Sequence, residues 1–292
     1  MTEYIIEAES LCFKYCDGTQ ALNGLSFKIE KGKKIAVLGS NGAGKSTLFL
    51  HLNGILKPDK GKILFNNQEI KYDQKSQAEL KRKVGIVFQD PDSQLFSASV
   101  YQEVSFGPMN LNLDKETVKK LVDNALEATN ISDLKNKPTH FLSYGQKKRV
   151  SIADIIAMSP EVIIFDEPTE FLDPKHKLQI IDLINRINEQ GSTVILSTHD
   201  VNMAYEWADN IILMKDGMVL KEGNAVEIFS DKDLIASSNL INPFILDIFE
   251  NLVEKKAVKN NCELPKNKLE LVELIMKAIE KQDYGSSVIC EP

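Results

Sequence analysis

The chain of 292 residues is long enough for one large α/β domain and a smaller unit, or for two compact domains, and its 43% hydrophobic and 26% charged residues exclude a disordered or fibrous protein. The net charge of -7 disfavours nucleic acid as the main partner, because neutralising phosphates requires clustered Lys and Arg. No stretch approaches the roughly 18 apolar residues of a membrane span, and the first residues lack a signal-sequence pattern, so we expect a cytoplasmic protein.

The cysteines and histidines follow no metal-ligand or redox spacing. No CxxC pair occurs, and disulfides are rare in the cytoplasm. We therefore expect free thiols at all four cysteines, Cys12, Cys16, Cys262 and Cys290.

Strand-like runs separated by Gly and Asn turns fill the first 70 residues. They predict strands at 4–15, 24–29, 34–39 and 62–65, which we expect to form an antiparallel layer. Farther along, apolar residues recur at helical spacing between 115 and 130 and again after Gln146. A helical subdomain is therefore predicted over about 75–160.

Apolar strands alternate with helices between 160 and 220. Strands are predicted at 162–165, 193–197 and 211–214, and helices at 178–189 and 201–208. This alternation is typical of a parallel sheet.

The tail, 240–292, is predicted to be a separate helical appendage that follows a main domain over 1–239. Two amphipathic stripes lie on either side of Pro265: Ile245, Ile248, Phe249, Leu252 and Val253, then Leu269, Val272, Met276 and Ile279. Helices this short do not form a stable domain alone. They are expected either to pack on the main domain or to pair across a dimer as a dimerisation element.

A phosphate-binding loop stands between the apolar strand 35–38 and a helical run from Leu48. Its glycines let backbone N–H groups surround phosphates, Lys45 contacts the outer phosphates, and Ser46 offers a magnesium ligand. The loop predicts binding of ATP and Mg²⁺ by Gly39, Ser40, Asn41, Gly42, Ala43, Gly44, Lys45, Ser46 and Thr47.

Two adjacent carboxylates end the predicted strand 162–165. Asp166 suits a second magnesium ligand, and Glu167 suits a general base for the attacking water. Paired acids at a strand end are often only a turn, but here they follow a phosphate loop.

The segment Leu142-Ser143-Tyr144-Gly145-Gln146 resembles the signature of the ABC ATPases, and the resemblance covers roughly 3–235. It implies an α/β fold: a P-loop ABC ATPase domain with a mixed sheet core, an antiparallel β layer and a helical subdomain. It also implies a head-to-tail dimer, expected to be a homodimer, in which Ser143, Gly145 and Gln146 of one subunit face the ATP held by the other.

Four further positions match the family residue by residue. The resemblance implies that Tyr15 stacks on adenine, that Gln89 ligates magnesium and senses the attacking water, that Asp173 belongs to the loop after the catalytic strand, and that His199 is a switch near the γ-phosphate. Glu167, His199 and Gln89 form the expected catalytic set, and Ser46, Gln89 and Asp166 the magnesium ligands. For Tyr15, Asp173 and His199 alone, a purely structural role would be an ordinary alternative.

The segments 89–96 and 104–111 resemble the ATPases of energy-coupling-factor importers, most closely the cobalt and nickel group. The resemblance implies an ATP-hydrolysing motor bound to integral membrane subunits at the cytoplasmic face of the membrane. The alternatives are the ATPase of a vitamin importer and, in a different class, a soluble ABC ATPase of DNA repair or translation. An inactive paralogue would lack the carboxylate that Glu167 provides.

Four residues depart from the family pattern. Tyr144 replaces the commonest glycine, and Glu170 and Phe171 stand where small residues are usual, in a loop expected to face the partner's phosphate site. Asp154 occupies a helix position where a small residue is expected, so it must find a partner or shift its pKa if it is buried.

Overall fold

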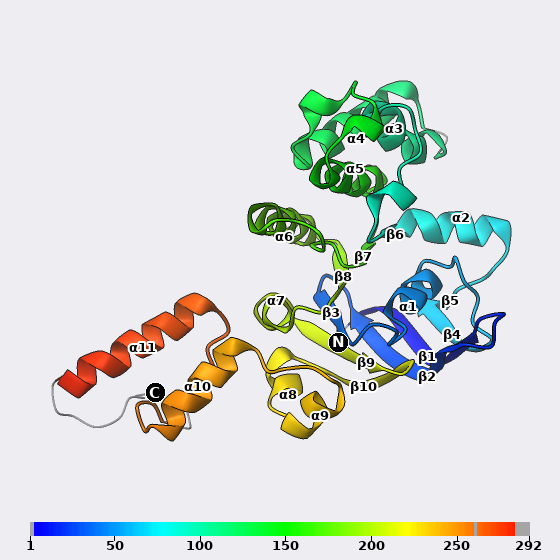
Figure 1. Cartoon of the computed structure of the whole chain (residues 1–292). Helices are drawn as coiled ribbons and strands as arrows, with labels where there is room; N and C mark the ends of the chain where they lie inside the picture. The colour runs from blue at the N-terminus through cyan, green and yellow to red at the C-terminus, as the bar shows by residue number, and fades with distance from the viewer. Residues whose placement is uncertain (1–2, 112, 260–261, 284–292) are drawn as a thin grey trace.

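The computed structural model describes residues 3–111, 113–259 and 262–283, and it contains two sheets (Figure 1). The first has four antiparallel strands in the order β2-β1-β4-β5. Their bounds are β1 Tyr4–Lys14, β2 Gln20–Glu30, β4 Lys60–Phe65 and β5 Gln68–Glu69. The second has six strands in the order β10-β9-β3-β8-β7-β6. Their bounds are β3 Lys34–Leu38, β6 Val84–Val87, β7 Val162–Phe165, β8 Thr193–Thr198, β9 Asn210–Lys215 and β10 Met218–Gly223.

The six-stranded sheet is parallel except for its edge strand β10, which pairs antiparallel with β9. Its five parallel strands are buried on both faces, whereas the edge strand β10 is partly exposed. In β3, Ala36 and Leu38 pack in one core and Ile35 and Val37 in the other. This double burial explains the nearly continuous apolar runs that predicted the sheet.

The expected antiparallel layer is confirmed for three of its four predicted strands. The run 34–39 was wrongly placed there: β3 pairs in parallel with β8 and β9 at the centre of the larger sheet. An apolar run without alternation is typical of a strand covered on both faces, which is the condition of β3 and of no strand in the antiparallel sheet.

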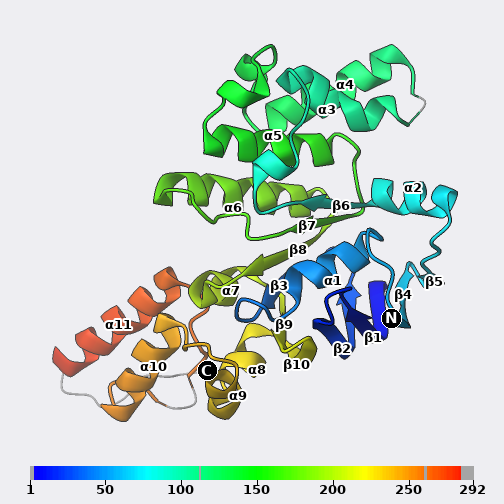
Figure 2. The same ribbon diagram turned by 45° about the vertical axis from the view of Figure 1, so that its right-hand side comes forward.

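Helices cover the larger sheet and form a separate layer at one end of it (Figure 2). The bounds are α1 Lys45–Leu52, α2 Gln74–Lys83, α3 Val100–Met109, α4 Lys115–Ala128, α5 Tyr144–Ile156, α6 Pro174–Glu189, α7 Val201–Trp207, α8 Ala225–Phe229 and α9 Lys232–Ser237. The helical subdomain expected over 75–160 begins later than predicted, because β6 within that range pairs with β7. The layer made by α3, α4 and α5 has its own core, which includes Val104, Val122 and Val150.

Asp154 lies inside this helical layer and has both a partner and a shifted pKa. Its Oδ2 accepts a hydrogen bond from Gln94 Nε2 at 3.3 Å, and burial raises the pKa of the Asp154 carboxyl to about 7. Gln94 also donates to Ser151 O, and its Oε1 accepts from Phe88 N. One side chain therefore joins the segment after β6 to helix α5.

The tail forms two helices, α10 (Phe244–Glu254) and α11 (Lys268–Asp283), beside α7 and α8 (Figures 1 and 2). Ile245, Leu246 and Leu271 join the core of the main domain, and Tyr205 OH donates to Pro265 O at 3.0 Å. The first predicted stripe is partly confirmed, with Ile245 and Phe249 buried.

The second predicted stripe is not the buried one. Helix α11 buries Leu271 and Ala278, which directly precede the stripe residues Val272 and Ile279. The four apolar side chains of the stripe remain exposed: Leu269, Val272, Met276 and Ile279. The helix is therefore apolar on two faces, and the helical spacing of apolar residues predicted the face that is exposed in the structure. The expected free thiol is also wrong for Cys262, which is disulfide-bonded, whereas Cys12 and Cys16 are free.

Among residues 3–111, 113–259 and 262–283, no helix is long and apolar enough to cross a bilayer.

Candidate active site

A cavity of about 830 Å³ lies at the carboxyl ends of β3, β7 and β8. This edge of a parallel sheet is where α/β proteins usually bind ligands. Most of the predicted site residues line the cavity: Tyr15, the whole loop Gly39, Ser40, Asn41, Gly42, Ala43, Gly44, Lys45, Ser46 and Thr47, and Gln89, Asp166, Glu167 and His199.

The loop between β3 and α1 needs its glycines. Gly39 and Gly44 have φ of 156° and 99°, and a Cβ there would meet Met214 O at 2.4 Å and Ala21 O at 2.5 Å. The loop delivers the chain to the N-terminus of α1, which no side chain of the described residues caps. Helices α2 and α4, by contrast, begin with Asp caps. The open N–H groups of α1 are therefore suited to an anion such as a phosphate.

Lys45 is buried beneath this loop and only 7% exposed. Its Nζ donates to Gly39 O at 2.7 Å and to Ser40 O at 3.2 Å. Burial lowers the pKa of the Lys45 ammonium, and the nearby carboxylates of Glu167 and Asp166 oppose that shift. The cation is held at the floor of the cavity, where phosphate oxygens can replace the loop carbonyls as its acceptors.

Ser197, at the end of β8, fixes the two predicted carboxylates relative to each other. Its hydroxyl donates to Asp166 Oδ1 at 2.6 Å and accepts from the backbone N–H of Glu167 at 2.9 Å. Glu167 has a φ of 43°, in the left-handed region, so the backbone turns sharply between the two acids. Because of this turn, the two carboxylates can serve the two roles expected for them, Asp166 as a magnesium ligand and Glu167 as a general base.

Glu167 has the environment of a general base. Burial raises the pKa of its carboxyl above the ordinary value, while His199 and Lys45 act in the opposite direction. His199 Nδ1 lies 3.2 Å from Glu167 Oε2. A carboxylate with a raised pKa is a better proton acceptor, and here it lies beside the cavity that would hold the attacking water.

The residues expected to hold magnesium fit that ion. Asp166 offers one buried carboxylate, and Ser46 and Gln89, which line the same cavity, offer neutral oxygens. Magnesium typically takes one or two carboxylates together with substrate phosphates, and it neutralises developing charge on them when bound. Within the described part of the chain there is no group of three or more His, Cys, Asp and Glu residues suited to a metal ion.

Tyr15 lies at the rim of the cavity, where the sequence predicted an adenine contact. Its hydroxyl is 3.0 Å from Thr47 Oγ1, and its ring meets Phe13 edge-on with centroids 5.0 Å apart. These contacts hold the ring against the end of the phosphate loop, and 38% of Tyr15 remains exposed for a stacking base.

Known proteins with this arrangement are ABC cassettes. The ABC transporter family matches residues 22–170. The energy-coupling factor transporter ATP-binding protein EcfA of Methanocaldococcus jannaschii is 50% identical over 87% of this chain and 91% of its own length. The solved structure of CbiO1 from Clostridium perfringens, part of the complex cbiONQ, is 48% identical with a TM-score of 0.73, over 86% of this chain and 99% of that one.

The chain belongs to the ABC transporter family. Within it, the chain is an ATP-binding subunit of the energy-coupling-factor type and an ATP-hydrolysing cassette. A cassette dimer in a post-hydrolysis state bound to ADP and Pi is 28% identical, with a TM-score of 0.69 over 75% of this chain and 98% of that one.

The signature segment of this ABC cassette lies outside the lining of its own nucleotide cavity, as do all of Ser143, Gly145, Gln146 and Asp173. Ser143 and Gln146 form a reciprocal capping box at the start of α5. Asp173 caps α6, accepting from the backbone N–H of His176 at 3.1 Å and from the His176 ring. These residues therefore lie at helix starts, outside the cavity of their own subunit.

Several cavity residues of the ABC cassette were not predicted from sequence. Glu170 was noted only as a departure from the family pattern, yet it lines the cavity. So do Thr19, Gln20, Ala21 and Val201, which neighbour predicted residues, and a distant segment, Asn239, Leu240 and Ile241. No motif marks this segment, since only the path of the chain after α9 brings it to the site.

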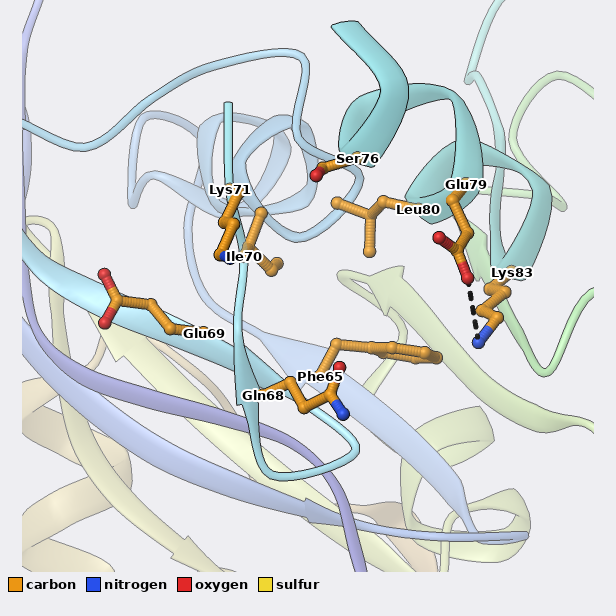
Figure 3. A pocket seen from close by; sticks show the side chains of 9 residues that line it. All are labelled: Phe65, Gln68, Glu69, Ile70, Lys71, Ser76, Glu79, Leu80 and Lys83. Carbon is orange, nitrogen blue, oxygen red and sulfur yellow. Dashed lines mark ion pairs between the residues drawn. The ribbon is translucent and has the colours of Figure 1, made fainter. Parts of the chain in front are cut away.

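A second cavity of the cassette, of about 460 Å³, lies between α2 and the β4–β5 hairpin (Figure 3). Phe65 and Leu80 are buried at its walls, and Glu79 pairs with Lys83 at 3.7 Å. None of the predicted site residues lines it, and its charged groups are partly paired already. We assign the chemistry to the first cavity.

Proposed function

We propose that this chain is the motor subunit of an importer, in which ATP binding closes a dimer, hydrolysis reopens it, and the cycle moves an integral membrane partner. The observation that carries the proposal is the cavity that joins Lys45, Asp166, Glu167 and His199 around an uncapped helix N-terminus. The names of the relatives support the transport role, since the Methanocaldococcus jannaschii protein is an energy-coupling factor transporter protein.

The functional unit in this proposal is a head-to-tail homodimer. In this dimer the start of α5 would supply the second half of the phosphate site, since it lies outside the lining of the cavity in its own subunit. A second copy would bring that half to the cavity. The 28% identical cassette, solved as a dimer, supports this arrangement.

The membrane partner would dock on an apolar patch in the helical layer, made of Phe96, Phe106 and Met109. Their exposed fractions are 67%, 51% and 65%, and the two phenyl rings meet edge-on with centroids 5.0 Å apart. Glu103, only 1% exposed, accepts the backbone N–H of Phe96 at 3.0 Å and so fixes the patch beside the segment that starts at Gln89. Large exposed apolar groups held rigidly are typical of an interface. Docking there would place the chain at the cytoplasmic face of the membrane.

The cargo in our proposal is a transition-metal ion, cobalt or nickel. The segments 89–96 and 104–111 resemble that importer group, and CbiO1 of Clostridium perfringens supports the assignment. The alternative is a vitamin, which the energy-coupling-factor relatives leave open. The cargo would bind the membrane subunits and not this chain.

Purification from membranes with the attached integral subunits, followed by reconstitution in lipid vesicles, tests the function and the cargo together. We expect ATP-dependent uptake of cobalt or nickel that Glu167→Gln abolishes. Uptake of a vitamin instead would overturn the metal assignment, and absence of attached membrane subunits would overturn the transport role. Phe96→Ser with Phe106→Ser should lose the partner, whereas Leu178→Ser, which alters another exposed apolar residue on α6, should keep it.

The exposed face of α11, made of Leu269, Val272, Met276 and Ile279, would pair with the same face of a second copy. The opposite face of α11 packs on the main domain through Leu271. The appendage can therefore pack on its own main domain and pair across a dimer at the same time. This pairing would keep two subunits together between ATP cycles.

A further inference from the structure

Two of the departures from the family pattern, Tyr144 and Glu170, contact Gln89, and a third, Phe171, packs on Tyr144. The Glu170 carboxylate accepts a hydrogen bond from Gln89 Nε2. The Tyr144 hydroxyl donates to the Gln89 carbonyl at 3.1 Å, and the Phe171 ring meets Tyr144 edge-on with centroids 6.1 Å apart. Residues that appear unrelated in the sequence are thus one contact cluster.

The backbone of Gln89 is held as firmly as its side chain. Lys148, fully buried in α5, donates from Nζ to Phe88 O at 3.0 Å and to Gln89 O at 2.6 Å. Phe171 has a φ of 59°, a conformation that costs a bulky residue about 1 kcal/mol or more. In this strained conformation the Phe171 ring packs on the Tyr144 ring. The backbone strain at Phe171 therefore accompanies the contact between these two rings.

The chemistry of the two side chains fixes which end of the Gln89 amide faces the nucleotide. An ionised carboxylate only accepts hydrogen bonds, so Glu170 can engage Nε2 and not Oε1 of Gln89. Oε1 has no hydrogen-bond partner among the described residues, and Gln89 lines the nucleotide cavity. The only atom of this amide that can ligate a metal ion is therefore the one left available.

We propose that Glu170 is a positioning residue that orients the Gln89 carboxamide so that Oε1 is presented to magnesium in the nucleotide cavity. It acts as a hydrogen-bonded partner behind a metal ligand, and loss of such partners typically weakens metal binding by about 10- to 100-fold. The proposal rests on the magnesium-ligand role of Gln89, which belongs to the proposed motor function.

A double-mutant cycle with a binding readout tests it. The affinity of Mn²⁺, used as a spectroscopic substitute for Mg²⁺, is measured on the full-length chain with a non-hydrolysable ATP analogue, for wild type, Glu170→Ala, Gln89→Ala and the double variant. Glu170→Gln repeats the test with the side-chain size conserved. Asp182→Ala, which removes an exposed carboxylate from α6, is the control for loss of charge.

We expect Glu170→Ala to weaken metal binding about 10-fold in the presence of Gln89 and to add little once Gln89 is replaced. Circular dichroism spectra and thermal unfolding of the variants should match those of the wild type, which shows that the variants are folded. An equal loss in the Gln89→Ala background would mean that Glu170 acts only through its charge and would overturn the orienting role. A Glu170→Ala variant with wild-type metal affinity would overturn it as well. Gln89→Ala with wild-type metal affinity would refute the ligand role itself, an outcome distinct from failure at Glu170 alone.

Discussion

His199 Nδ1 lies 3.2 Å from Glu167 Oε2, so the predicted switch histidine and the predicted general base form a direct pair. Glu167 is largely buried, whereas 65% of the His199 side chain is exposed. The exposed partner is free to change its contacts, while the backbone of Glu167 stays anchored to Ser197.

Glu167→Gln should preserve ATP binding and lower hydrolysis by about 10²- to 10⁴-fold, the usual contribution of a general base. The amide keeps the shape of the side chain and cannot take the proton. Steady-state phosphate release and nucleotide binding by the purified variant measure the two effects, with Glu189→Gln as an exposed control. Turnover within tenfold of wild type would remove Glu167 from this role.

The rate of hydrolysis should fall on acidification at a higher pH than an ordinary glutamate would give. Burial raises the pKa of Glu167, and only its deprotonated form accepts a proton. A pH–rate profile at saturating ATP, with nucleotide binding followed in parallel, checks this. A rate that stays constant down to the ordinary carboxyl range would contradict the raised pKa.

Tyr15→Ala should weaken ATP binding by about 1 to 3 kcal/mol, the range for a base stacked on an aromatic ring. Tyr15→Phe separates the two interactions of the side chain, because it keeps the ring and removes the contact with Thr47. Calorimetric titration should find Tyr15→Phe close to wild type. An unchanged dissociation constant in Tyr15→Ala would leave Tyr15 with a structural role only.

Asp154→Asn should stabilise the protein increasingly as the pH rises. The pKa of Asp154 is raised from 3.8 to about 7, so folding favours the protonated acid. The corresponding contribution is complete below the unfolded pKa and is lost as pH rises through the folded one. The difference in unfolding free energy between Asp154→Asn and wild type should widen between about pH 4 and pH 7, by at most about 4 kcal/mol, and stay level above. Denaturant titrations across this range measure it, and a difference independent of pH would show that Asp154 does not titrate this way.

Val272→Glu together with Met276→Glu should weaken self-association of the nucleotide-free protein without unfolding the monomer. Both side chains are about half exposed on α11, so the new charges disrupt only a face-to-face contact. Deleting the tail after Asn239 is a less specific change, because it also removes Ile245, Leu246 and Leu271 from the main core. Light scattering measures association. The control is Lys277→Glu, which makes the same change in net charge at an exposed position of α11 outside the apolar face. A monomeric wild type, or an equally tight dimer of the variant, would exclude the pairing.

Local patterns predicted the parts of this protein that local chemistry determines. The loop 39–47 requires glycines in its own backbone, and the acids 166–167 follow directly on a buried strand, so the sequence was sufficient for both. The position of β3 was not predicted, because the partner of a strand depends on residues far away in the chain. For α11 the helical period was right and the buried face was wrong, since both faces are apolar and only the packing of Leu271 on the main domain decides between them.

The segment Asn239–Ile241 joins the appendage to the main domain and is also a wall of the nucleotide cavity. Immediately after it, the backbone N–H of Phe244 donates to Asn202 Oδ1, three residues beyond His199. A nucleotide that fills the cavity therefore covers the connecting peptide itself. Cleavage of this connection should therefore depend on nucleotide: a protease that cuts at Ile241, 73% exposed, should cut the empty protein sooner than the loaded one.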